Sequence, residues 1–543
     1  MFPTQRARLA SPLRSERSCV LARRGMVATS VPIASAAGVE TLRRGGNAID
    51  AAIAAVAVLS VVEPMQTGIG GDAFALFWSA RERRLVGLNG SGRAPRRATL
   101  AAYRERGLAA IEPHGILSAT VPGAVDAWET LSRRYGALDF ATLLEPAIRA
   151  AEHGFAVTEL VAHFWWGLER MGALRNAEAR ETFAPGGATP AAGAWFRNPR
   201  LAASLRAIAK GGAAAFYRGE LAEAIVAASR REDGCFELDD LATHRSTWVE
   251  PLAVRWGDVT LAELPPNGQG LTALLAVHVL AQLPPSPAGS ALGWHRRIEA
   301  VKLAMADRDA YLADPEHARV PSAALLSERY ARERAALIGE RALALPAPGA
   351  LGGDTTVLCT ADAEGNQVAF IQSLFTGFGS GIACGDTGIL LQSRGAGFRL
   401  DAAHPSALAP GKRPFHTLMP GFLLKDGAPW LAFGIMGGDV QAQAHTAFVA
   451  QLVECGANPQ EALDAPRFRW QAGARVVVEA PELAVAEGGT LGAALAARGH
   501  AVEPPPALAA DVFGGGQAIA RADNLWLGAS DHRKDGCALG LWE

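Results

Sequence analysis

Thr355, at the start of a predicted strand, is the residue of this sequence best placed for nucleophilic catalysis. The run Gly352-Gly353-Asp354-Thr355-Thr356 places a flexible approach before a β-like segment that continues to Ala361, and a turn leads into a second β-like run. If the bond between Asp354 and Thr355 is cut, the Thr355 hydroxyl and α-amine share one residue as nucleophile and base. An ordinary hairpin is the alternative, since Thr favours strands and Gly, Asp and Asn favour turns.

Two consecutive glycines, Gly437 and Gly438, lie between an apolar β-like run and a helix predicted over 441–454. Backbone N–H groups at the positive end of a helix can hold an oxyanion during acyl transfer. A plain turn between strand and helix is the alternative reading of the pair.

Two side chains in later loops are candidates for substrate contacts. Arg394 lies in a glycine-containing loop and can bind a carboxylate through two parallel hydrogen bonds, although a surface arginine is the ordinary alternative. His416 precedes an apolar run and could act as a base or a donor, or pack as a hydrogen-bonded core residue. The loop at 68–71 lacks the Lys-Ser/Thr pair of a phosphate-binding loop, so nucleotide binding is not expected.

The elements that must position these residues are predicted from hydrophobic period and from Gly/Pro stop signals. Helices are expected over 34–42, 48–62 and 295–312, and the second is apolar nearly all round and therefore buried. The region 100–350 reads as mostly helical, and its end, 343–351, is expected to be an exposed loop that tolerates a chain break. Strands are expected at 26–30, 73–78, 85–89, 357–361, 368–373, 388–391, 419–424 and 430–435.

Composition limits the classes of function. The 543 residues include 52 basic and 54 acidic ones, a net charge of -2 that argues against a general nucleic-acid surface. The longest apolar stretch, 51–62, is too short to cross a bilayer, and the basic N-terminus lacks the apolar region of a secretory signal, so a cytoplasmic protein is expected. The six cysteines form no Cys-x-x-Cys pair, and neither a metal nor a cofactor is expected.

A series of short motifs keeps one order from about residue 26 to near the C-terminus, which is more specific than any single motif. The motifs are Gly45-Gly46-Asn47-Ala48-Ile49-Asp50-Ala51-Ala52, Glu63-Pro64, Gly68-Ile69-Gly70-Gly71, Val121-Pro122-Gly123, Asp354-Thr355-Thr356, Gly377-Phe378-Gly379-Ser380-Gly381, Gly388-Ile389-Leu390-Leu391, Lys412-Arg413-Pro414 and Gly437-Gly438. With them the chain resembles the γ-glutamyltransferase (γ-glutamyltranspeptidase) family of N-terminal-nucleophile hydrolases.

The resemblance implies an α+β fold, a four-layer αββα sandwich with two stacked antiparallel sheets. It also implies self-cleavage between Asp354 and Thr355. After an N-terminal extension over 1–25, the large subunit would span 26–354 and the small subunit 355–543, and the two would form one intertwined domain.

The same resemblance implies the roles of the catalytic residues. Thr355 would attack the carbonyl of a small-molecule amide with its α-amine as base, oriented by Thr356 and by Ser373. The N–H groups of Gly437 and Gly438 would hold the oxyanion. Water or an amine acceptor would then release the acyl group.

The substrate clamp of glutathione-using members is mostly missing, which puts the usual γ-glutamyl substrate in doubt. Their carboxylate-binding arginine has no match, with Arg93 the nearest arginine, and their ammonium-binding aspartate is a glycine. The replaced positions are Ser91, Phe375, Gly397, His416 and Thr417. We therefore expect an acyl group that carries a carboxylate, held by Arg394, and that needs no α-amine.

Members of this kind include oxamate amidohydrolases and cephalosporin or glutaryl acylases. A true γ-glutamyltransferase or glutathione hydrolase, in which Arg93 takes the carboxylate role, is an alternative, as is an acyltransferase that uses an amine acceptor. A processed but inactive binding protein is the alternative from another class. The segment 398–412, where glutathione-using members carry a lid, looks shortened, which favours water as the acceptor.

Overall fold

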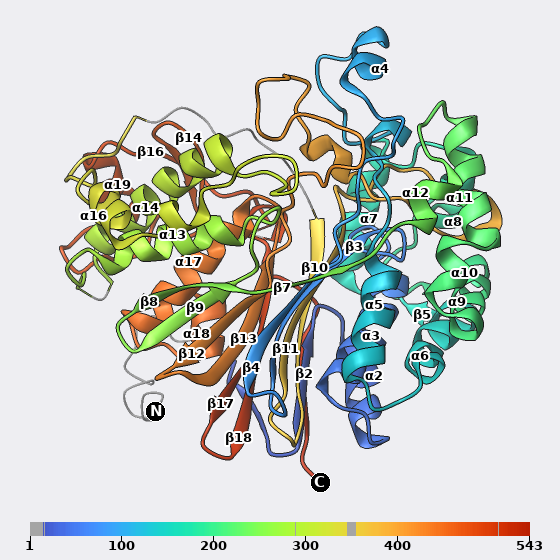
Figure 1. Ribbon diagram of the computed structural model, residues 1–543. Coiled ribbons are helices and arrows are strands. Elements are labelled where there is room, and N and C mark those ends of the chain that lie inside the picture. The colour runs from blue at the N-terminus through green and yellow to red at the C-terminus, as the bar shows by residue number, and fades with distance from the viewer. Residues whose placement is uncertain (1–14, 16, 288, 345–353, 509) are drawn as a thin grey trace.

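Two antiparallel sheets form the centre of the computed structural model, which describes residues 15, 17–287, 289–344, 354–508 and 510–543 (Figure 1). Sheet 1 contains, in spatial order, β1 (Val20–Ala22), β18 (Leu525–Ser530), β17 (Gly515–Ala522), β13 (Ala428–Met436), β12 (Gly421–Lys425), β9 (Val259–Glu263) and β8 (Leu252–Trp256). Sheet 2 contains β19 (Cys537–Leu541), β2 (Gly25–Thr29), β10 (Asp354–Ala361), β11 (Gln367–Phe375), β3 (Asp72–Ser79), β4 (Arg84–Asn89) and β7 (Thr247–Val249).

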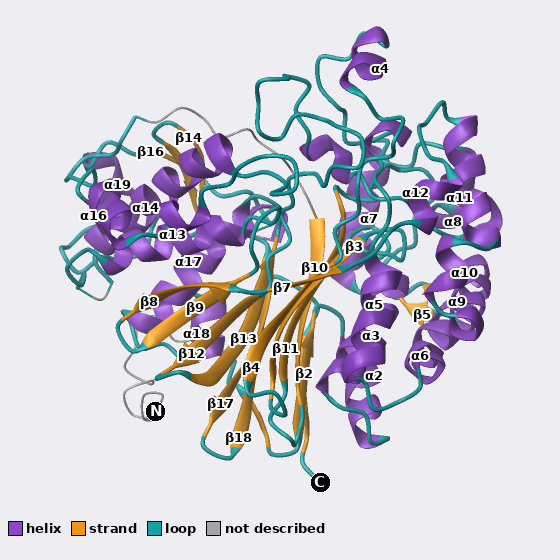
Figure 2. Ribbon diagram, viewed as in Figure 1, coloured by secondary structure: helices purple, strands orange, loops and turns teal. Residues whose placement is uncertain are grey.

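Helices cover the outer faces of the two sheets (Figure 2). The helices on the side of sheet 2 are α2 (Pro32–Arg43), α3 (Ala48–Val62), α5 (Ala124–Tyr135), α6 (Phe140–His153), α7 (Glu159–Arg170), α8 (Ala177–Phe183), α9 (Pro199–Gly211), α10 (Ala213–Tyr217), α11 (Glu220–Arg231) and α12 (Leu238–Ala242), with α4 (Leu100–Glu105) above them. The helices on the side of sheet 1 are α13 (Gly270–Ala281), α14 (Ala291–Tyr311), α16 (Glu328–Ala335), α17 (Val440–Val453), α18 (Pro459–Asp464) and α19 (Leu491–Ala497). The short helices α15 (Ser322–Leu325) and α20 (Ala510–Phe513) contact α16 and α17, respectively.

Two smaller sheets lie outside the central pair. One consists of β14 (Phe468–Ala472), β15 (Arg475–Val478) and β16 (Ala501–Glu503), and the other of β5 (Phe155–Ala156) and β6 (Trp195–Phe196). Within the described ranges, no helix has both the length and the apolar character needed to cross a membrane.

Strand alternation explains how β10 takes part in two different cores. Val357 and Cys359 pack between the sheets with residues of sheet 1 such as Phe422, whereas Leu358 points outward and packs beneath α3. Successive side chains of a strand point to opposite faces, so a residue's parity in β10 decides which core it enters. The first residues of β10 are therefore fixed from both sides.

The sequence predicted much of this arrangement correctly. The expected α+β class with two antiparallel sheets is confirmed, and α3 occupies the predicted range, with all of its residues buried. Asn47 begins that helix with a capping box. Its side chain accepts from the N–H groups of Ile49 and Asp50, and the Asp50 carboxylate accepts from the Asn47 N–H. Residues 345–351 of the loop predicted at 343–351 lie outside the described part of the chain.

Three expectations about the elements were wrong or incomplete. Residues 388–391 form no strand, because the chain turns at Gly385 and Gly388, whose φ angles are 58° and 68°, and leaves only an isolated bridge at Leu390. The block 100–350 is mostly helical, as predicted, but the short strands β5 to β9 also lie within it. Part of the predicted N-terminal extension, Val20–Ala22, is a strand paired with β18.

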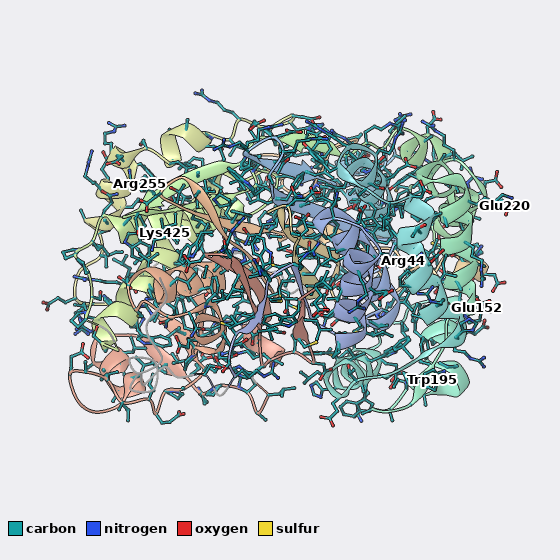
Figure 3. The ribbon with its side chains drawn as sticks, turned by 90° about the horizontal axis from the view of Figure 1, so that it is seen from below. Arg44, Glu152, Trp195, Glu220, Arg255 and Lys425 are labelled. Carbon is teal, nitrogen blue, oxygen red and sulfur yellow. The ribbon has the colours of Figure 1, made fainter. Side chains whose placement is uncertain are left out.

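Replacing Phe422 by alanine tests the packing between the sheets. The ring is wholly buried between them, so Phe422→Ala should lower the free energy of unfolding by about 3–5 kcal/mol in a denaturant titration. Trp195→Ala is the control, because that side chain is 66% exposed and lies at the edge of the molecule in Figure 3; it should cost less than about 1 kcal/mol. Equal losses in the two variants would contradict this description of the core.

Candidate active site

Thr355 is the second residue of β10, a strand that begins near the upper end of the two sheets in Figure 1. It is 1% exposed, and its Oγ1 donates to Ser373 Oγ on neighbouring β11 at 3.4 Å. Oγ1 also accepts from Gln441 Nε2, in the first turn of α17, at 3.3 Å. Both contacts are long for hydrogen bonds of these types, so the hydroxyl is held loosely between two polar groups.

Thr356 points the other way and is bonded to a buried carboxyl group. Its Oγ1 donates to Glu63 Oε2 at 2.8 Å, and Ser30 Oγ donates to the same oxygen at 2.6 Å. Burial raises the pKa of Glu63, and the two hydroxyl donors oppose that shift. Because Glu63 caps the end of α3, this network ties the start of β10 to the helix behind it.

Gly437 and Gly438 form the connection between β13 and α17. Their φ angles of 127° and 62° lie in the region that favours glycine, so the pair allows a sharp strand-to-helix turn. Two interactions hold the turn: Gln269 Nε2 donates to the Gly438 carbonyl at 3.0 Å, and Arg308 Nη1 donates to Asp439 Oδ1 at 2.9 Å.

Arg394 is a buried cation with unused donors. Its guanidinium is 0% exposed, donates through Nη1 to Thr417 Oγ1 at 2.8 Å and stacks 4.2 Å from the centre of the Phe375 ring. Within the described chain, its Nε and Nη2 have no hydrogen-bond partner. Burial lowers the pKa of Arg394 to about 9, an effect that the nearby Asp72 opposes, so the group remains charged at neutral pH.

Asp72 lies near this cation, and His416 bonds to Asp72. Asp72 Oδ1 accepts from Gln392 Nε2 at 2.9 Å and from the Gly92 and Gly123 N–H groups at 3.0 Å, while burial raises its pKa to about 7. His416 Nδ1 accepts from the Leu418 N–H at 3.2 Å, which leaves the proton on Nε2 for the 3.1 Å bond to Asp72 Oδ2. Burial and the Arg394 charge lower the pKa of His416 well below its usual range, so it is neutral.

The remaining positions of the expected substrate clamp have other contacts or no space for a side chain. Arg93 forms a partly exposed ion pair with Glu316 at 2.9 Å and donates to the Gly411 carbonyl at 3.0 Å. Ser91 Oγ accepts from Asn267 Nδ2 at 3.0 Å. A Cβ atom at Gly397 would lie 2.8 Å from the Phe415 carbonyl oxygen, so the backbone leaves no room for a side chain there.

The structure thus brings most of the predicted residues into one connected set. Thr355 contacts Ser373 directly, and Arg394 contacts both Phe375 and Thr417. Gln269 Nε2 joins the two parts, because it donates to the Thr417 carbonyl at 2.8 Å as well as to Gly438. Only Arg93 lies in a separate ion pair at the surface.

Four polar residues of the site were not predicted from the sequence. They are Glu63, Asp72, Gln269 and Gln441, and each is buried at the end of an apolar element. Asp72 follows Gly70-Gly71 directly, and that position was the available signal for it. The partners of these residues are far away in the sequence, so the pattern alone does not reveal the contacts.

Among the residues that the structure describes, two groups of histidine and carboxylate side chains lie close enough to share a metal ion, and neither suits one. In the first, His295, Glu299 and His500, the carboxylate is already bonded to Lys302 at 2.6 Å. In the second, Asp464, Asp531 and His532, both oxygens of the buried Asp531 accept from arginines. A positive side chain in each group opposes a second cation.

Comparison with known proteins identifies the family. A family model described as gamma-glutamyltranspeptidase matches residues 34–541. The glutathione hydrolase-like YwrD proenzyme of Bacillus subtilis is 40% identical over 456 residues, which cover 83% of this chain and 86% of that protein. The oxamate amidohydrolase proenzyme of Klebsiella pneumoniae is 36% identical over 527 residues, 95% of this chain and 98% of that protein.

A solved structure shows the same fold over the whole chain. The crystal structure of a cephalosporin acylase from Bacillus halodurans has a TM-score of 0.92 and 42% sequence identity, and the match covers 100% of this chain and 99% of that one. The expectation of an enzyme of this kind is confirmed. The chain belongs to the gamma-glutamyltranspeptidase family and is an enzyme of its N-terminal threonine hydrolase type.

Proposed function

We propose that the protein is a self-processing amidohydrolase whose nucleophile is Thr355 and whose substrate carries a carboxylate on its acyl group. The observation that carries this proposal is the position of the Thr355 hydroxyl, buried at the start of a central strand between Ser373 and Gln441. A hydroxyl on the first residue after a cut can use its own α-amine as base, which is the threonine variant of nucleophilic catalysis.

The reaction follows from these groups. The α-amine of Thr355 takes the Oγ1 proton as Oγ1 bonds to the amide carbon, and the carbonyl electron pair moves to oxygen. N–H groups of Gly437 and Gly438 stabilise that oxyanion. When the C–N bond breaks, the α-ammonium returns its proton to the leaving amine. Water then attacks the ester carbon and gives a proton to the α-amine. The bond between that carbon and Oγ1 breaks, the α-ammonium returns the proton to Oγ1, and the acid is released.

Processing between Asp354 and Thr355 would divide the chain into a large subunit ending at 354 and a small subunit 355–543. Strands from both sides of this bond contribute to both sheets: β1, β8 and β9 precede it in sheet 1, and β10, β11 and β19 follow it in sheet 2. This mixing supports one intertwined domain after the cut. With helices outside both sheets, it also supports the αββα architecture of N-terminal-nucleophile hydrolases.

The substrate class is inferred from Arg394. A buried guanidinium with two unpaired donor atoms is costly, and a carboxylate can accept from both in parallel. Phe375 and Thr417 both contact the Arg394 guanidinium, and His416 bonds to Asp72, the carboxylate near that guanidinium. Gly397 has no room for the aspartate that would bind an α-ammonium, so a dicarboxylic or oxamate-like acyl group fits better than γ-glutamyl.

The names of similar proteins agree with this proposal and keep alternatives open. Oxamate amidohydrolase and cephalosporin acylase denote amide hydrolysis without a γ-glutamyl group. The glutathione hydrolase-like relative keeps true γ-glutamyl transfer or hydrolysis as the first alternative, in which Arg93 would have to leave its ion pair with Glu316. The contacts around Thr355 favour catalysis over a role as an inactive binding protein.

Substitutions at Thr355 test the nucleophile. Thr355→Ala removes the hydroxyl, so it should stay one uncut chain on a denaturing gel and lose measurable amide hydrolysis. Thr355→Ser keeps a hydroxyl and should be cut and active, although more slowly. Thr360→Ala, in the same strand, is the control and should be processed like the natural protein. Hydrolysis by a pure, uncut Thr355→Ala sample would refute the proposal.

Paired substrates test the carboxylate site. Arg394→Gln should raise KM for glutaryl-p-nitroanilide about 10- to 100-fold, because it removes a charged pair of hydrogen bonds, and should leave butyryl-p-nitroanilide little changed. The matched control is Arg93→Gln, which should alter neither. If γ-glutamyl-p-nitroanilide is the best substrate and only Arg93→Gln impairs it, the glutathione hydrolase alternative is correct.

A further inference from the structure

Within the described chain, Gln441 is the one helical residue whose side chain forms a hydrogen bond with the Thr355 hydroxyl. It lies in the first turn of α17, three residues after Gly438, and its side chain is 0% exposed. Its Nε2 donates to Thr355 Oγ1 at 3.3 Å. The glycine turn before it and the Gln269 bond to Gly438 fix the start of the helix that carries it.

The other half of the Gln441 amide lacks a partner. Among the described residues, its Oε1 is buried and accepts no hydrogen bond. An unpaired buried acceptor is unfavourable and is rare in folded proteins. Gln443, two residues further along the same helix, shows the ordinary arrangement: its Nε2 donates to the Trp470 carbonyl at 3.2 Å and its Oε1 accepts from the Trp470 N–H at 2.8 Å.

We propose that Gln441 is a catalytic residue that binds both reacting groups of Thr355, with Nε2 donating to Oγ1 and Oε1 accepting from the α-amine that appears when the 354–355 bond is cut. This inference rests on the proposed function. In the uncut chain the nitrogen of Thr355 belongs to a peptide bond, and cleavage gives it the additional N–H that the unpaired oxygen lacks.

The two contacts have different chemical effects. A donor aimed at Oγ1 stabilises the negative charge that develops as its proton leaves. An acceptor for one amine N–H orients the amine, so that its lone pair can face the hydroxyl proton. An amide holds its oxygen and nitrogen side by side, as threonine holds its amine and hydroxyl, so one side chain can serve both groups.

Three variants test this role. Gln441→Met keeps the volume but removes donor and acceptor, and it should lower kcat about 100-fold per processed chain, the usual cost of one donor to a developing charge. Gln443→Met removes a matched amide from the same helix and should leave kcat within about twofold. Gln441→Glu places a carboxylate beside the α-ammonium and favours its charged form, so the acid limb of the kcat/KM profile should move to higher pH.

Processing and folding are followed in the same samples by denaturing gel and thermal melting. A folded Gln441→Met protein that remains uncut, while Gln443→Met is cut normally, also supports the inference, because the same hydroxyl attacks in both reactions. If Gln441→Met retains kcat within about twofold and the Gln441→Glu profile does not move, Gln441 is not catalytic. That result would leave the nucleophile assignment intact as long as Thr355→Ala is inactive.

Discussion

The position of the first residues of β10 is the constraint on which the whole site depends. A hydroxyl that is almost wholly buried must find hydrogen-bond partners within the protein, and those of Thr355 come from β11 and from the first turn of α17. Thr356 is bonded on the opposite face to Glu63 at the end of α3. The strand is thus fixed between both helical layers, and its start cannot shift without breaking contacts on two sides.

In the function we propose, a buried cation gives the site its selectivity. Arg394 is stacked on Phe375 and bonded to Thr417, yet two of its donor atoms are unsatisfied within the described chain. Asp72 balances part of its charge and is itself held by the neutral His416. Buried donors without partners are unfavourable, and a bound carboxylate that accepts from them would remove that cost. The proposed function therefore concentrates binding energy on acyl groups that carry an anion, and the close approach of the backbone at Gly397 agrees with it.

The sequence predicted the parts of the molecule whose signals are local. The α3 helix has its predicted bounds because an apolar run follows a capping asparagine. The glycine pair before α17 was recognised because two glycines between a strand and a helix are also a local signal. Gln441 escaped prediction because its partner lies 86 residues away, and a polar residue in a first helical turn has no distinctive pattern. The false strand at 388–391 arose from apolar residues whose flanking glycines turn the chain. Family resemblance, rather than any single motif, raised Thr355 above an ordinary hairpin.

Trapping the acyl-enzyme tests the central claim most directly. The purified protein is mixed briefly with a carboxylate-bearing amide, quenched in acid, digested and analysed by peptide mass spectrometry. The account predicts a peptide that begins at Thr355 and carries the acyl group as an ester on that residue. An active enzyme whose 354–355 bond is intact, or whose acyl group is attached to another side chain, would contradict it.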